Sequence, residues 1–182
     1  MHGQGEPDPN RRLRTLLPLL AALLAAGAAG PAAAERATPS GYPVPRYISL
    51  KFDKVYARAG PGEDHRLLWV YQVKGLPVQV VAENSQWRRI CDPQGNMAWV
   101  HKRLTDGRRT VMRVRQSPLP IRSRPRAEAE IRAYLNPRAI AALVRCDEDW
   151  CKVRVDGVTG WAPASGLWGT ADAVQCRPSH AR

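Results

Sequence analysis

Four cysteines are the residues of this chain best suited to covalent chemistry: Cys91, Cys146, Cys151 and Cys176. Cys146 and Cys151 flank Asp147-Glu148-Asp149-Trp150, and in a hairpin with a four-residue loop they would lie opposite each other. An antiparallel pair of this kind brings two Cα atoms to about 4.5–5.5 Å, which a disulfide tolerates. We therefore expect a Cys146–Cys151 bond. Four cysteines allow three connectivities. In the connectivity that contains Cys146–Cys151, the remaining Cys91 and Cys176 pair and tie the end of the chain to the first domain.

Zinc binding and catalysis are the alternatives for these residue types. A zinc site would favour Cys-x-x-Cys spacing, which is absent, and His65, His101 and His180 are scattered. No Ser/His/Asp or Cys/His arrangement has a recognisable context, and no Gly-rich phosphate loop precedes a helix. The carboxylates with possible roles stand in predicted turns, as is typical of solvated loops: Asp64, Asp92 and Asp147-Glu148-Asp149. The sequence therefore predicts no catalytic residue, no metal, no cofactor and no enzyme.

The first 34 residues have the pattern of a secretory signal peptide. Arg11, Arg12 and Arg14 precede an apolar run from Leu16 to Ala29, and Ala32-Ala33-Ala34 supplies an Ala-x-Ala cleavage site. A transmembrane anchor is the alternative, but the run is shorter than the roughly 18–20 residues that a span needs. We predict a periplasmic or secreted protein with no transmembrane segment after cleavage. Such a compartment allows disulfides to form.

Two stretches of the chain repeat each other. Trp87-Arg88-Arg89-Ile90 is followed by Gly95 and Ala98-Trp99-Val100, and Trp150-Cys151-Lys152-Val153 is followed by Gly157 and Gly160-Trp161-Ala162. In each copy a short break with a glycine separates two β-prone runs, which predicts a strand, a tight turn and a second strand. Each copy is preceded by a short apolar strand with an arginine and a Pro-containing loop, in Val55-Tyr56-Ala57-Arg58 and in Leu119-Pro120-Ile121-Arg122. The repeating unit is therefore of roughly 60 residues, the size of a small domain.

The order of these motifs resembles the bacterial SH3-like domain. The resemblance rests on Val55-x-x-Arg58-x-Gly60-Pro61-Gly62, Gly75-Leu76-Pro77-Val78, Trp87-x-x-Ile90 and Trp99-Val100. It covers Gly41 to Gly169, is more specific in the first copy, and points to the exported, tandem-SH3 branch of Gram-negative bacteria. Two positions depart from the pattern: Ala98 replaces the usual glycine, and Arg124 stands where the first copy has Gly60.

An all-β chain with many short strands and Gly/Pro turns forms a barrel or a sandwich. We predict two tandem small SH3-like, partly open β-barrels after the signal peptide. The expected bounds are residues 1–34 for the signal peptide, 35–46 for an extended Pro-rich segment, 47–110 and 111–170 for the two domains, and 171–182 for a polar tail.

Two segments of the repeat need separate interpretation. Residues 127–135 favour a helix by propensity, but the repeat favours a loop followed by a strand, and we prefer the repeat because tertiary context overrides propensity. The continuous apolar run Leu67–Tyr71 predicts a buried strand.

Core and ligand-binding residues are predicted from the aromatic and apolar positions of the two copies. As structural core we expect Trp87, Ile90, Trp150 and Val153, with Trp87→Ala and Trp150→Ala each costing roughly 3–5 kcal/mol. As ligand-binding residues, where aromatic side chains lie beside arginines, we expect Tyr56, Arg58, Trp69, Trp99, Arg122 and Trp161.

The formal net charge of +12 favours binding to an anionic partner. The resemblance implies a non-catalytic exported adaptor. We expect a monomer that recognises a cell-envelope ligand, either a peptidoglycan peptide or an envelope protein. The alternatives are charge-driven binding to an anionic polymer or membrane surface, and a role as partner subunit of a cell-wall enzyme. Export argues against nucleic acid as the partner.

Overall fold

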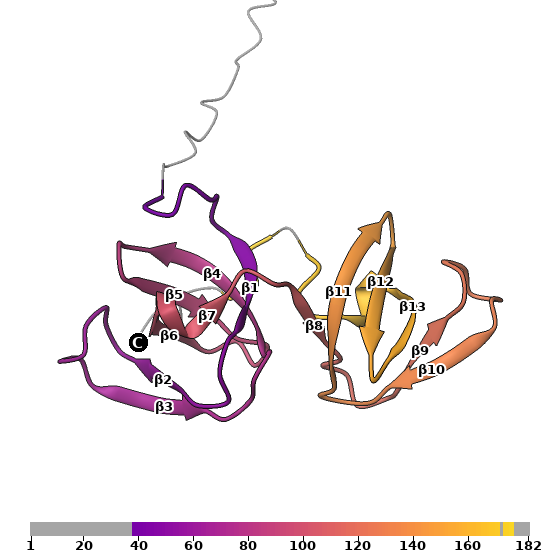
Figure 1. Ribbon diagram of the computed structural model, residues 1–182, viewed down its shortest axis with the longest axis horizontal. Coiled ribbons are helices and arrows are strands. Elements are labelled where there is room, and N and C mark those ends of the chain that lie inside the picture. Colours follow the sequence, from indigo (N-terminus) through magenta and orange to yellow (C-terminus); the bar gives the residue numbers. More distant parts are fainter. Residues whose placement is uncertain (1–37, 172, 177–182) are drawn as a thin grey trace, which may run out of the picture. The chain divides into compact units, whose positions relative to one another are not determined.

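The computed structural model describes residues 38–171 and 173–176. The predicted signal peptide, 1–34, and the first residues of the Pro-rich segment lie outside the described residues. Within the described part the fold is all-β, as predicted: two antiparallel sheets, with only two 3-10 turns, η1 (Lys102–Leu104) and η2 (Ala164–Gly166), as helical segments (Figure 1).

Seven strands form the first sheet, in the order β3-β2-β6-β5-β4-β1-β7. Their bounds are β1 (Arg46–Leu50), β2 (Val55–Arg58), β3 (Leu67–Tyr71), β4 (Pro77–Glu83), β5 (Trp87–Cys91), β6 (Met97–His101) and β7 (Thr105–Asp106). Six strands form the second sheet, in the order β10-β9-β13-β12-β11-β8. Their bounds are β8 (Thr110–Met112), β9 (Leu119–Arg122), β10 (Ile131–Leu135), β11 (Ile140–Asp147), β12 (Trp150–Val155) and β13 (Val158–Pro163).

The two sheets are built to one plan. The order β3-β2-β6-β5-β4 in the first matches β10-β9-β13-β12-β11 in the second, strand for strand. Each also has a register shift at the corresponding point, between Val80 and Ala82 in β4 and between Leu143 and Arg145 in β11. The duplication seen in the sequence therefore extends to the register of the ladders, and residues of the two barrels can be matched one to one.

Each barrel encloses its own apolar cluster. The first is made mainly of alternate residues of its strands: Ile48, Leu50, Val55, Ala57, Tyr71, Leu76, Val78, Val80, Ile90, Ala98, Val100 and Met112. The second contains Val111, Leu119, Ile121, Leu135, Ala141, Cys151, Val153, Ala162 and Leu167. Because successive side chains of a strand point to opposite faces, the intervening residues lie on the face of the sheet away from the cluster. We call this the outer face.

The hairpin turns use backbone conformations with positive φ. Asp156 and Gly157 have φ of 47° and 79°, and they join β12 to β13 through the Val155–Val158 pair. An Asp-Gly pair of this kind matches the twist of a two-residue hairpin. The hairpin between β11 and β12 also has a two-residue turn, because Asp147 pairs with Trp150. The prediction of a four-residue loop there was wrong, although the two cysteines still face each other.

The two segments that the sequence analysis treated separately both contain strands. Residues 131–135 form β10, so the repeat decides over helix propensity. Leu67–Tyr71 is also a strand, β3, but the prediction that it is buried was wrong: Leu67 is 42% exposed. The reason is its position, because β3 lies at the edge of its sheet and is covered on fewer sides.

Candidate functional site

A row of basic and aromatic side chains crosses the outer face of the first sheet. Arg58 of β2 pairs with Trp99 of β6, and Trp99 pairs in turn with Arg89 of β5. Arg89 then pairs with Ala82 of β4. Side chains of directly paired residues lie on one face with Cβ atoms about 4.5–5.5 Å apart, so these four positions are contiguous. We call Arg58, Trp99, Arg89 and Ala82 the first row.

The second sheet carries the equivalent row. Arg122 of β9 pairs with Trp161 of β13, and Trp161 pairs with Lys152 of β12. Lys152 pairs with Arg145 of β11. Arg122, Trp161, Lys152 and Arg145 form the second row, in which an indole is again flanked by two cations.

The rows differ at their last position, where the first has alanine and the second has arginine. The guanidinium carbon of Arg145 lies 5.3 Å from the ring centroid of Trp161, close enough for a cation–π interaction. Trp161 is accordingly only 8% exposed. Trp99 is half-buried, and Ala82 is too short to cover its indole. The indole of the first row is therefore open to a ligand, and that of the second is covered.

The arginine of each row also holds a loop. Arg58 donates from Nη1 to the carbonyl of His65 over 2.9 Å, and Arg122 donates from Nη1 to the carbonyl of Ala129 over 2.7 Å. Both acceptors lie seven residues further along the chain. Each guanidinium thus fixes the loop that follows its strand and keeps other N–H groups for a ligand.

Two further predicted ligand residues lie on different faces. Tyr56 is on the outer face of β2 with Arg58; it is 42% exposed, and the Lys54 ammonium lies 5.5 Å from its ring centroid. Trp69 packs against the first apolar cluster and meets Tyr71 edge-on at 6.0 Å between ring centroids. The structure thus brings Tyr56, Arg58 and Trp99 together, and it places Trp69 with the core.

Of the four predicted core residues, two lie in the apolar clusters and two lie outside them. Ile90 and Val153 are fully buried within the two clusters. Trp87 is buried but outside the first cluster, where it meets the His101 ring at 5.2 Å, and Trp150 is only half-buried. Each tryptophan precedes its apolar partner by three positions, an odd spacing that puts the two on opposite faces of a strand. Trp150 is therefore not a core residue, and the prediction that placed it in the core was wrong.

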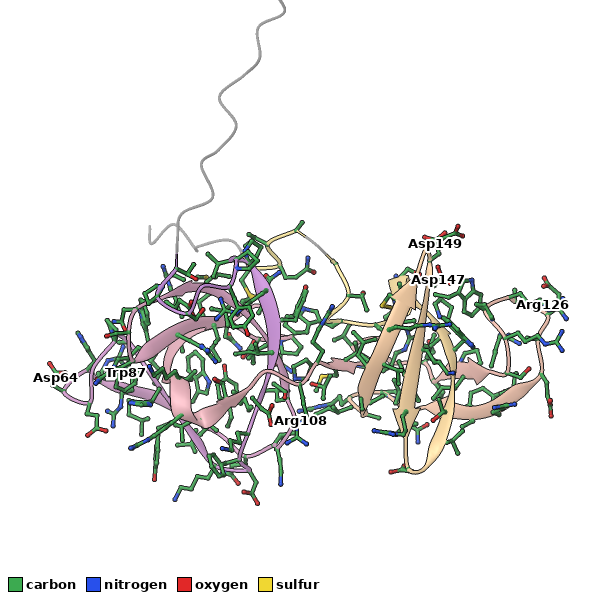
Figure 2. All side chains as sticks on the ribbon, turned by 45° about the horizontal axis from the view of Figure 1, so that its top comes forward. Asp64, Trp87, Arg108, Arg126, Asp147 and Asp149 are labelled. Carbon is green, nitrogen blue, oxygen red and sulfur yellow. A yellow bond between two sulfur atoms is a disulfide. The ribbon has the colours of Figure 1, made fainter. Side chains whose placement is uncertain are left out.

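Both expected cysteine pairs are disulfides in the structure. Cys146–Cys151 joins residues 5 apart and Cys91–Cys176 joins residues 85 apart. Asp147 and Asp149 lie at the tip of the β11–β12 hairpin beside the first of these, as Figure 2 shows. Among residues 38–171 and 173–176, no three His, Cys, Asp or Glu side chains are grouped so as to hold a metal ion.

Two acidic side chains, Glu83 and Asp92, are buried, and the sequence did not predict their burial. The Glu83 side chain is 1% exposed and accepts hydrogen bonds from Arg46 over 2.5 Å, from Arg88 over 3.4 Å and from Ser40. Burial alone would raise the pKa of its carboxyl, but the hydrogen bonds from Arg46 and Ser40 lower it to about 2. The carboxylate is therefore ionised at neutral pH and anchors the segment before β1 to β4.

Asp92 is the second buried acid. It was expected in a turn, and it is, but it is only 2% exposed. It accepts from the backbone N–H groups of Gln94 and Asn96, each over 2.9 Å, and from the Tyr71 hydroxyl over 3.0 Å. Burial, followed by the charge of Asp92, raises the pKa of Tyr71. These contacts fix the β5–β6 turn, and nothing in the spacing of the sequence distinguishes such a turn from a solvated one.

No helix in the described part of the chain is long and apolar enough to cross a membrane. No curated protein matches the chain. Two solved structures from Trichomonas vaginalis are similar to it at 13% identity and a TM-score of 0.31: NlpC1, with 69% of this chain and 46% of that chain covered, and NlpC2, with 70% and 49%. The chain thus spans about half the length of these structures.

The family model for the bacterial SH3 domain matches the chain twice, over residues 51–107 and over residues 115–169. The first match contains β2 to β7 and the second contains β9 to β13, so each covers one set of equivalent strands. Together they account for more than half of the chain, which therefore belongs to the bacterial SH3 domain family.

Proposed function

We propose that this protein is an exported, non-catalytic binding protein whose barrels recognise an anionic cell-envelope ligand, either a peptidoglycan peptide or an envelope protein. The observation that carries the proposal is the row of cation, indole and cation found at matched positions in both barrels. An indole offers a flat apolar face, and the flanking guanidinium and ammonium groups favour carboxylates. A peptide with free carboxylates fits both features.

Export is part of the proposal. It is supported by the signal-peptide pattern of residues 1–34 and by two disulfides, which persist in oxidising compartments. Removal of residues 1–34 would take away three arginines, Glu6 and Asp8, and would leave a formal charge of +11. We propose a periplasmic or secreted monomer that has no cofactor.

The open indole makes the first barrel the principal binding site in this proposal. Ala82→Arg would give the first row the arginine that covers Trp161 in the second row. The substitution adds a positive charge, so the two candidate functions predict opposite results. If the row binds the ligand, covering Trp99 weakens binding. If charge alone drives binding, the added arginine strengthens it.

The test is co-sedimentation of the purified protein with isolated peptidoglycan sacculi at low and at moderate salt. We expect retention at both, and an affinity at least tenfold lower for Ala82→Arg. Ala127→Arg, which adds the same charge at an exposed residue of the second barrel, is the matched control and should bind as the unaltered protein does. Absence of retention at both salt concentrations would overturn the proposal for sacculi.

Charge-driven binding to an anionic polymer or a membrane surface is the second candidate, and the net charge of +12 favours it. It predicts that both alanine-to-arginine variants bind more tightly and that affinity falls steeply between low and physiological salt. A role as partner subunit of a cell-wall enzyme would instead give retention that requires a protein in the sacculus preparation and is lost after protease treatment.

A further inference from the structure

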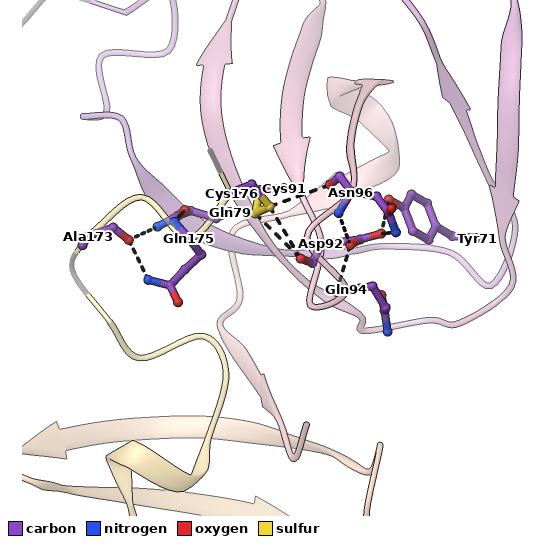
Figure 3. Close-up of a disulfide and its surroundings, with 9 residues drawn as sticks. All are labelled: Tyr71, Gln79, Cys91, Asp92, Gln94, Asn96, Ala173, Gln175 and Cys176. Atoms are coloured by element: carbon purple, nitrogen blue, oxygen red, sulfur yellow. Dashed lines mark hydrogen bonds between the residues drawn. A yellow bond between two sulfur atoms is a disulfide. The ribbon is translucent and has the colours of Figure 1, made fainter. Parts of the chain in front are cut away.

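The outer face of β4 in the first barrel binds a segment of the chain's own C-terminal region. The carboxamide of Gln79 donates from Nε2 to the carbonyl of Ala173 over 2.9 Å and accepts at Oε1 from the N–H of Gln175 over 2.8 Å (Figure 3). One side-chain amide thus satisfies a carbonyl and an N–H two residues apart, as a backbone amide does in a β-ladder. Gln79 itself is only 1% exposed.

A disulfide holds the same segment beside this contact. Gln79 pairs with Cys91 in the β4–β5 ladder, and Cys91 is bonded to Cys176. Cys91 is fully buried and Cys176 is 3% exposed. The segment is therefore fixed by two hydrogen bonds between its backbone and the Gln79 side chain and by one covalent bond.

An open hollow of about 230 Å³ lies next to the carboxamide. Its lining residues are Pro45, Arg46, Tyr47, Gln79, Arg109 and Ala171. The hydrogen bonds of Gln79 go to backbone atoms of Ala173 and Gln175, so they select the placement of a backbone carbonyl and N–H rather than a particular side chain. The hollow leaves room for a side chain of such a peptide.

The second barrel lacks this arrangement. Gln79 corresponds to Ala142 and Cys91 to Arg154, because both pairs occupy the same step of the ladder. Alanine can neither donate nor accept a hydrogen bond through its side chain. The contact is thus a specialisation of the first barrel.

We propose that the outer face of β4 around Gln79 is a binding site for a polypeptide segment whose backbone offers a carbonyl and an N–H two residues apart, that residues 173–176 are its resident ligand, and that thiol–disulfide exchange opens it. A dithiol reductant attacks one sulfur of the Cys91–Cys176 bond through its thiolate, and the other sulfur leaves as a thiolate and takes a proton. The second thiol of the reductant then displaces the mixed disulfide. The reductant ends as a disulfide, and Cys91 and Cys176 end as thiols, so two electrons and two protons are transferred.

This site is independent of the proposed cell-envelope binding, because Gln79 and the C-terminal segment form it and the two rows do not. The first measurement is hydrogen exchange at the Gln175 amide in the full chain. Exchange should become at least tenfold faster after reduction with dithiothreitol. The Cys146→Ala/Cys151→Ala chain, which retains only the Cys91–Cys176 bond, should respond equally. Unchanged exchange after reduction would overturn the proposed opening.

The second measurement tests the site itself. Cys91→Ala/Gln175→Pro/Cys176→Ala in the full chain removes the covalent bond and the N–H that Gln79 binds, so its own segment no longer competes at high effective concentration. A labelled synthetic peptide with the sequence of residues 170–176 and Cys176→Ala should bind this chain in fluorescence anisotropy and should not bind the oxidised natural chain. The same peptide with Gln175→Pro is the matched control and should bind at least tenfold more weakly. Absence of binding, or equal binding of the two peptides, would overturn the site.

Discussion

The first barrel has a glutamate and an arginine at the position where the second barrel has a disulfide. Glu83 pairs with Arg88 one step beyond Ala82–Arg89, and Cys146 pairs with Cys151 one step beyond Arg145–Lys152. Both pairs close the same hairpin in front of its turn. One is ionic and buried, and the other is covalent.

The two solutions place different demands on the rest of the chain. A buried carboxylate must be fully hydrogen-bonded, and Glu83 obtains this from Arg46 and Ser40, which precede or begin β1. The disulfide needs no such partners and stays intact as the pH changes. The first barrel has its own disulfide elsewhere, between Cys91 and the C-terminal segment. A repeated fold can therefore keep one ladder position and change the chemistry that stabilises it.

The long-range disulfide should give the largest difference between the barrels. Loss of Cys91–Cys176, which spans 85 residues, is expected to cost about 4.5 kcal/mol on the chain-entropy model. Urea unfolding of Cys91→Ala/Cys176→Ala measures the change. A cost below that of removing Cys146–Cys151 would contradict the entropic account.

Substitution of the two matched tryptophans, Trp87 and Trp150, should give the next largest difference in the free energy of unfolding. Trp87 is 7% exposed, so Trp87→Ala should cost about 4 kcal/mol. Trp150 is half-buried, and Trp150→Ala should cost less than about 2 kcal/mol. Thermal or urea unfolding of both variants checks the order. Equal costs would mean that the exposed fraction of each indole does not set its contribution to the free energy of unfolding.

The ionic pair should make the first barrel sensitive to acid. Since the folded pKa of Glu83 is about 2, below the ordinary 4.5, its stabilisation is present above pH 4.5 and is lost as the pH falls toward 2. In Glu83→Gln the unfolding free energy should depend less on pH in this range. An unchanged pH dependence in that variant would show that other carboxyl groups are responsible.

The short disulfide should give the smallest effect. Cys146–Cys151 closes a loop with a separation of only 5 residues, and its removal by Cys146→Ala/Cys151→Ala should cost about 2 kcal/mol. The effect should be the same at pH 3 and at pH 7, in contrast to that of Glu83→Gln. Unfolding at both pH values makes the comparison, and a cost that changes between them would count against it.

The repeat made the strand order and the nature of residues 131–135 predictable, since a duplicated motif constrains both copies at once. The faces of Trp87 and Trp150 could also have been predicted, because their odd spacing from Ile90 and Val153 was visible in the sequence. The burial of Glu83 could not. The Arg46 and Ser40 partners lie about 40 residues earlier in the sequence, and the pairing of β1 with β4 brings Arg46 beside Glu83. The contact between Gln79 and the C-terminal segment could not be predicted either, because it joins residues 94 and 96 positions apart.

The one-to-one match of the two ladders is tested most directly by giving the first barrel the chemistry of the second. In Glu83→Cys/Arg88→Cys the two new thiols should form a disulfide on mild oxidation, as Cys146 and Cys151 do, and peptide mapping by mass spectrometry should find it beside the two natural ones. If both thiols stay free for alkylation after oxidation, the two positions are not equivalent.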